Sequence, residues 1–214
     1  MGGIFNYDNP VFRAINKLTD IIIISVCWFF ACIPIFTIGA ANAALYSSTR
    51  VSIRKDKGYA FSGFWKAFKD NFKPATKAWL IQLIVIIVLA SDIYVTMDAA
   101  KLGKTWGSFF VVFWILLAFV TAWCEYTYAY VSRFEQTTKN TLKNAALIMI
   151  AKLPWTVLAI VLTAVGVVVF YLLPFLIVVL PAVICVFLEL IFERIFRTLM
   201  TPEEVEKEKE DDLI

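Results

Sequence analysis

Residues 153–188 contain no charged side chain, and this uncharged run constrains the fold more than any other feature. A straight helix over this range would be about 54 Å long, whereas about 20 apolar residues suffice to cross about 30 Å of hydrocarbon. The run must therefore fold back on itself. We expect the turn at Pro174, because proline lacks a backbone N–H donor and disfavours a continuous helix.

Three further segments are apolar enough to cross a bilayer. With the two halves of the uncharged run they give about five spans: residues 20–46, 78–97, 106–130, 155–173 and 175–192. The composition agrees, since 61% of residues are hydrophobic and only 17% are charged, against about 25% in a soluble domain. We therefore expect an all-α polytopic membrane helix bundle, with residues 1–197 as one transmembrane domain and residues 198–214 as an acidic cytoplasmic tail.

The basic residues alternate between the two sides of these spans. Sixteen of the 20 Lys and Arg residues fall on one side, which the positive-inside rule assigns to the cytoplasm. This places the N-terminus outside, and the C-terminus and the loop between the first two spans inside. Trp79, Trp106 and Trp155 fall at span ends, where an indole ring favours the membrane interface. We expect a multi-pass plasma membrane protein with the lipid bilayer as its surroundings.

The first span has other interpretations. Arg13 and Lys17 precede the apolar run, and the small residues 41–43 follow it, as around the cleavage site of a signal peptide. Pro34 and Gly39 could equally break the helix into a re-entrant bend. The small residues from Gly39 onward favour close helix packing. A broken helix that lines a substrate site, as in some transporters, is the functional alternative.

Several classes of activity are excluded by composition and motifs. The chain has no histidine, so catalytic triads that contain histidine, histidine metal sites and histidine proton relays are absent. No phosphate-binding loop, dinucleotide fingerprint or nucleophile elbow occurs. Four cysteines lie in apolar runs without metal-ligand spacing, as small hydrophobes do: Cys27, Cys32, Cys124 and Cys185. We expect no enzyme activity, no catalytic residue, no cofactor, no metal and, without a global basic patch, no nucleic-acid partner.

Three acidic residues lie in or near the spans: Asp92, Glu125 and Glu189. Charges in lipid are costly, which makes such residues candidates for function. Glu125 and Glu189 both fall near the cytoplasmic side, within reach of Arg133, Arg194 or Arg197. We therefore expect structural ion pairs, since a proton or cation pathway would need an acid near the midplane.

The loop between the first two spans contains an amphipathic helix that ends at Pro74. Aromatic residues recur at helical spacing, and basic residues occupy the other faces. This helix either lies on the anionic inner leaflet or docks a partner. The candidate contact residues are Phe61, Phe64, Trp65, Phe68, Phe72, Lys66, Lys69 and Lys73.

Residues 34–41, 44–46, 57–59 and 64–73, with 141–145 and 192–196, resemble the YesL family in order and spacing. The resemblance extends over about residues 9–196. It implies a small integral membrane protein of the bacterial plasma membrane, of unassigned activity, from a family whose genes often lie beside those of carbohydrate ABC importers and glycoside hydrolases. It therefore suggests a non-enzymatic accessory role in carbohydrate uptake, with importer permease subunits as partners; a homo-oligomer is compatible with it. A small solute or lipid transporter or channel is the alternative.

Overall fold

The computed structural model describes residues 10–55 and 59–200, and every regular element in these ranges is helical. In chain order the elements are α1 (Pro10–Cys32), η1 (Ile35–Thr37), α2 (Ile38–Ser48), η2 (Thr49–Arg54), α3 (Ala60–Lys101), η3 (Thr105–Phe109), α4 (Phe110–Val131), α5 (Thr138–Ala151), α6 (Leu153–Leu172), η4 (Pro174–Val178) and α7 (Leu180–Arg197). The expected all-α helix bundle is confirmed. From residue 201 on, the expected acidic tail lies outside the described residues.

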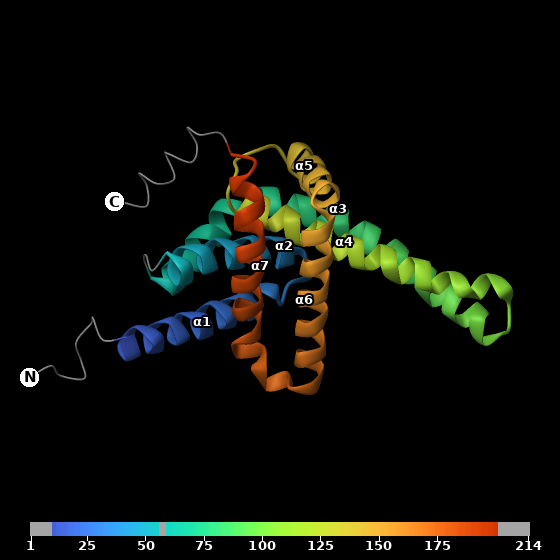
Figure 1. The fold of residues 1–214 in the computed structure, drawn as a ribbon, viewed down its shortest axis with the longest axis horizontal. Helices are drawn as coiled ribbons and strands as arrows, with labels where there is room; N and C mark the ends of the chain where they lie inside the picture. Colours follow the sequence, from blue (N-terminus) through green and yellow to red (C-terminus); the bar gives the residue numbers. More distant parts are fainter. Residues whose placement is uncertain (1–9, 56–58, 201–214) are drawn as a thin grey trace, which may run out of the picture.

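Four helical segments of the described chain are long and apolar enough to cross a membrane: Ala14–Cys32, Ala60–Lys101, Thr105–Val131 and Leu153–Leu172. The expected fifth span, 175–192, corresponds to η4 and most of α7. Helix α7 is not among the four, because its last three turns carry four charged residues, Glu189, Glu193, Arg194 and Arg197. Helices α6 and α7 form a hairpin, and η4 with Pro174 makes its turn (Figure 1).

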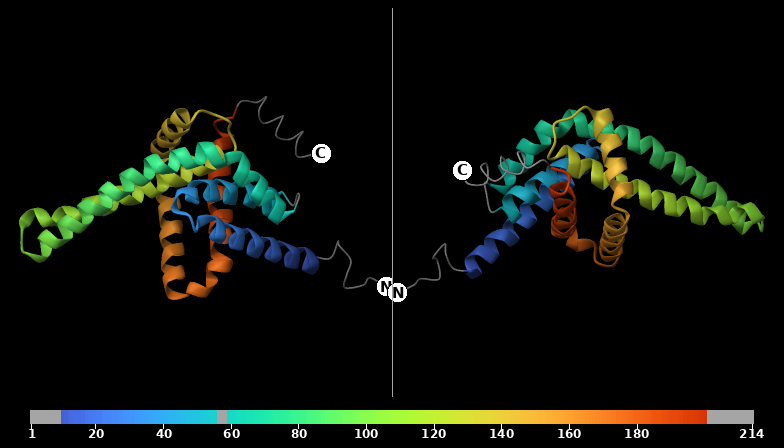
Figure 2. Two further views of the ribbon diagram at one scale, coloured as in Figure 1. Left: turned by 180° about the vertical axis from the view of Figure 1, so that it is seen from behind. Right: turned by 45° about the horizontal axis from the view of Figure 1, so that its top comes forward.

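The α3/α4 pair extends away from the α6/α7 hairpin, and α1 leaves the centre on the other side (Figures 1 and 2). The α3/α4 turn depends on two glycines. Gly103 has φ 73°, a left-handed conformation that favours glycine. A Cβ atom on Gly107 would lie 2.3 Å from the backbone nitrogen of Ala100, so the two helices can close only on a glycine here. Around the distal half of this pair many apolar side chains are exposed, as expected of a lipid-facing surface.

The first apolar segment, expected as one span over residues 20–46, is two helices separated at residues 33–37. A break inside a membrane is tolerated where other groups satisfy the freed backbone carbonyls. The hydroxyl of Thr37 lies 2.6 Å from the backbone oxygens of both Ala31 and Pro34. The indole nitrogen of Trp79 donates to the backbone oxygen of Ile35 at 2.7 Å. The break is therefore a stabilised element of the fold.

The small residues of α2 pack tightly against α3, as expected from the sequence. A Cβ atom on Gly39 would lie 2.5 Å from Trp79 Cβ and 2.6 Å from the backbone oxygen of Ala75. Ala40, Ala43 and Ala75 belong to one buried cluster. Trp79, expected at a membrane interface, is buried among the helices, and its N–H is bonded at the α1–α2 break.

Helix α1 is also tied to the rest of the bundle. The hydroxyl oxygen of Ser25 accepts a hydrogen bond from the backbone nitrogen of Ala182, at 3.2 Å, and lies 3.3 Å from the backbone oxygen of Val179. Ser25 and Ile24 are fully buried. Cleavage of α1 as a leader would remove these groups from the core and leave the start of α7 without its hydrogen-bond partner.

The amphipathic helix expected between the first two spans is the first part of α3 and not a separate helix. Pro74, expected to end it, lies inside α3, which continues to Lys101. The whole helix has 42 residues and is about 63 Å long, twice the hydrocarbon thickness. In Figures 1 and 2 it changes direction along its length, as expected of a helix that contains a proline. The basic first part and the apolar part therefore form one continuous helix, and the basic part extends beyond the apolar part.

Candidate functional site

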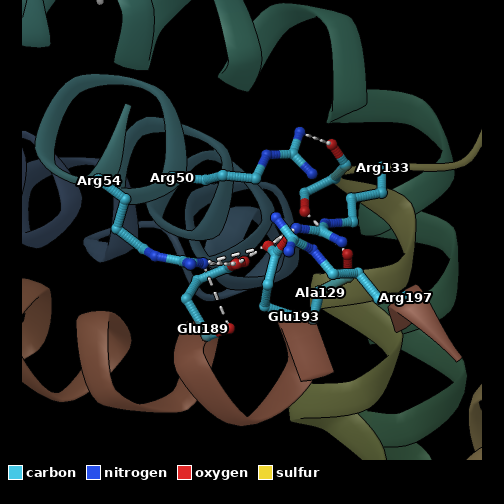
Figure 3. A network of polar contacts seen from close by, with 8 residues as sticks. Arg50, Arg54, Ala129, Arg133, Glu189, Glu193 and Arg197 are labelled. Carbon is cyan, nitrogen blue, oxygen red and sulfur yellow. Dashed lines mark hydrogen bonds and ion pairs between the residues drawn. The ribbon is translucent and has the colours of Figure 1, made fainter. Parts of the chain in front are cut away.

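Charged residues from three separate elements meet near the C-terminal end of α7 (Figure 3). Glu189 and Glu193 are one helical turn apart on α7, and Arg197 follows after another turn, so all three share a face. Arg54 ends η2, and Arg133 comes just after the end of α4. We call these five residues the arginine–glutamate cluster.

Glu193 is the centre of the cluster. Its Oε1 accepts from Arg197 Nε at 2.7 Å, and its Oε2 lies 3.2 Å from Arg54 Nη1 and also pairs with Arg133 Nη2. Burial alone would raise the pKa of Glu193, but the surrounding guanidinium groups outweigh burial and lower it to about 2. Glu193 therefore stays ionised, and the three arginines hold it in that state.

Glu189 is fully buried at the inner side of the cluster. Its Oε2 lies 3.6 Å from Arg54 Nη1 and 3.9 Å from Arg133 Nη2, too far for a strong hydrogen bond. The side chain of Arg133 is only 4% exposed, and its guanidinium carbon lies over the ring of Phe196, 5.5 Å from the ring centre. The cluster thus links η2, the end of α4 and α7 through partly buried charges, which indicates that it stabilises the fold.

The expected ion pairs of the intramembrane acids are correct in part. Glu189 does lie against Arg133, although Arg54 was not foreseen. The ion pair expected for Glu125 is wrong, because the nearest described partner of its carboxylate is the hydroxyl of Thr163 on α6, which donates to Oε1. Arg194 lies over the ring of Trp155, 5.8 Å from its centre. Asp92 is half-buried on the distal part of α3.

Glu125 borders a cavity of about 430 Å³ between the helices. The walls are almost entirely apolar and come from α1, α2, α3, α4, α6, η4 and α7. Trp28 lines it and donates from its indole nitrogen to Asn42 Oδ1 at 2.9 Å, across the α1–α2 break. The broken first span therefore forms one wall of the cavity.

The candidate contact residues of the first part of α3 divide into two groups. Phe64 is fully buried, and Trp65, Phe68 and Phe72 are partly buried against the core. Phe64 is therefore corrected from a contact residue to a core residue, because this part of α3 packs on the bundle and not on the surface alone. The exposed members are Phe61, Lys66, Lys69 and Lys73.

No three acidic, cysteine or histidine side chains meet as a metal site in residues 10–55 and 59–200. The four cysteines carry no disulfide, and Cys27, Cys124 and Cys185 are buried. The sequence analysis missed Arg54, Glu193 and Thr163. The Glu189–Glu193–Arg197 spacing was a usable signal, since residues four apart on a helix are neighbours.

Comparison with known proteins bears on the region that holds the break and the basic part of α3. Residues 21–93 match DUF624, a protein family of unknown function. The DUF624 match covers about a third of the chain, from α1 to the apolar part of α3. YesL proteins belong to DUF624. No curated protein and no solved structure matches the chain.

Proposed function

We propose that this chain is a non-enzymatic accessory protein of the bacterial plasma membrane that binds the permease subunits of a carbohydrate ABC importer. The resemblance to YesL proteins suggests this role, and the DUF624 match agrees with that resemblance without assigning a function. The observation that carries it is the first part of α3, a helix held to the bundle by Phe64 and continuous with a membrane span. Its exposed Phe61, Lys66, Lys69 and Lys73 offer a rigid basic surface at the cytoplasmic side.

Co-purification tests this surface directly. We expect the full chain, solubilised from native membranes in mild detergent, to bring down importer permease subunits. We also test a variant with Phe61→Ser, Lys66→Glu, Lys69→Glu and Lys73→Glu. The amount of permease recovered with it should fall at least about tenfold, because like-charge contacts across an interface cost several kcal/mol. All four side chains lie on the surface, so the fold should survive.

The matched control is Lys101→Glu, an exposed reversal at the far end of α3. It should leave co-purification unchanged. Recovery of the protein alone from wild-type membranes, together with normal growth of a deletion strain on oligosaccharides, would refute the accessory role.

A small solute or lipid transporter or channel is the second candidate, and the broken first span beside the Glu125 cavity favours it. Flux across vesicles that contain the purified protein is the measurement. We expect saturable flux of at least one solute or lipid in a broad panel, lowered by Glu125→Gln. Absence of flux across the panel would count against this candidate. Substitution of Gly39 would not be informative here, because this glycine packs α2 against α3.

A further inference from the structure

The cavity beside Glu125 has mostly apolar walls, although Asn42, Thr121, Tyr128 and Thr163 also line it. On α7 its lining residues run from Leu180 to Leu188, about 12 Å along the helix axis. Phe170 and Ile184 contribute to its walls, and Trp28 and Trp79 line it from α1 and α3. A strongly hydrated solute such as a sugar would lose most of its hydrogen bonds in such a space, because the few polar side chains cannot replace them all. The walls suit a hydrocarbon chain.

Glu125 is the one charged residue among the described residues that line the cavity. Its Oε1 is bonded by Thr163, but its Oε2 is buried and accepts no hydrogen bond from the residues that the structure describes. Among residues 10–55 and 59–200, no lysine or arginine lines the cavity. A carboxyl group at this depth either takes up a proton or is stabilised as a carboxylate by a cation. Arg54, Arg133 and Arg197 pair with Glu193 instead, so these described arginines supply no counter-charge to the cavity.

We propose that this cavity binds a single-chain amphiphile with a primary ammonium head. The ammonium group would donate to the free Oε2 of Glu125, and the chain would lie along α7 toward Leu180. An ammonium group provides three donors and the missing positive charge, whereas a carboxylate or phosphate head would bring a second negative charge next to Glu125. A hydroxyl head would offer a donor but no charge.

This site goes beyond the accessory role and does not depend on it, because binding is measured on the purified chain without a partner. It is also separable from transport. An ammonium amphiphile that binds but does not cross vesicles would refute the transporter and leave the site intact.

Equilibrium binding to the full chain in zwitterionic lipid nanodiscs tests the proposal. The probes are radiolabelled dodecylamine, dodecanol and dodecanoic acid, each corrected for uptake by empty nanodiscs. We expect saturable binding of dodecylamine, tighter than that of the other two. Glu125→Gln keeps the size of the side chain, removes its charge and replaces one acceptor oxygen by an NH₂ donor. This substitution should weaken the binding of dodecylamine at least about tenfold and change the affinity for dodecanol by less than about twofold.

A second pair of variants tests the location. Thr121 lines the cavity and is exposed. Thr121→Trp should therefore narrow the cavity and weaken the binding of dodecylamine without disturbing the core. Ile115→Trp, on an exposed position of the same helix that does not line the cavity, should bind as wild type does. Equal dodecylamine affinity in wild type and Glu125→Gln, or dodecanoic acid as the tightest probe, would overturn the proposal.

Discussion

Replacement of Arg133 by methionine should lower the free energy of unfolding by about 3–5 kcal/mol, the cost of removing one partner from a buried ion pair. The side chain of Arg133 is nearly buried and pairs with Glu193 and, more distantly, with fully buried Glu189. Methionine keeps the apolar stem of the side chain but removes the guanidinium group that lies over Phe196, and it leaves the two carboxylates with less positive charge. The measurement is thermal or denaturant unfolding of the purified protein in one fixed detergent.

A double variant separates lost charge pairing from lost packing. In Arg133→Met with Glu189→Leu the buried acid is removed as well, so part of the lost stability should return, since a paired buried charge can often be replaced by apolar residues at little cost. Lys139→Met, an exposed change on α5, is the surface control and should stay within about 0.5 kcal/mol of wild type. Equal stability of Arg133→Met and Lys139→Met would show that the arginine–glutamate cluster does not stabilise the fold.

The helical architecture follows from the sequence because hydrocarbon thickness limits the length of a span and proline disfavours helix continuation. These two facts lead to the α6/α7 turn at Pro174 and to the apolar segments of α1, α3 and α4. The same reasoning about proline fails at Pro74. There the helix continues, because Phe64 on one side and Trp79 on the other are both anchored in the core. Tertiary packing outweighed a local signal.

The candidate site was less accessible to sequence reasoning. Helical periodicity identifies an aromatic face but cannot show that Phe64 turns into the bundle while Phe61 stays outside. The pairing of Arg54 with α7 joins residues 139 positions apart, and no local pattern carries that contact. The cavity depends on the meeting of several helices around Glu125. Sidedness stays a prediction from the distribution of Lys and Arg.

Substitution of Gly39 should have the other large effect, because its Cβ would lie 2.5 Å from Trp79 Cβ and 2.6 Å from the backbone oxygen of Ala75. Neither atom can move away by a change of side-chain rotamer, so α2 and α3 must separate. Gly39→Ala should cost about 1–3 kcal/mol, the usual range for overpacking. Gly39→Leu should prevent the native packing of α2, with loss of monodisperse protein in size-exclusion chromatography.

Gly63, in the first part of α3, is the matched control. A Cβ atom there meets only the hydroxyl oxygen of Ser52, at 3.9 Å, which is an ordinary contact. Gly63→Ala should therefore raise stability by up to about 1 kcal/mol, because alanine loses less backbone entropy than glycine in a helix interior. If both alanine variants unfold like wild type, α2 is not packed on α3 as closely as the Gly39 contacts require. Opposite signs at the two positions would show that space at the α2–α3 interface, and not helix propensity, determines the requirement for glycine at position 39.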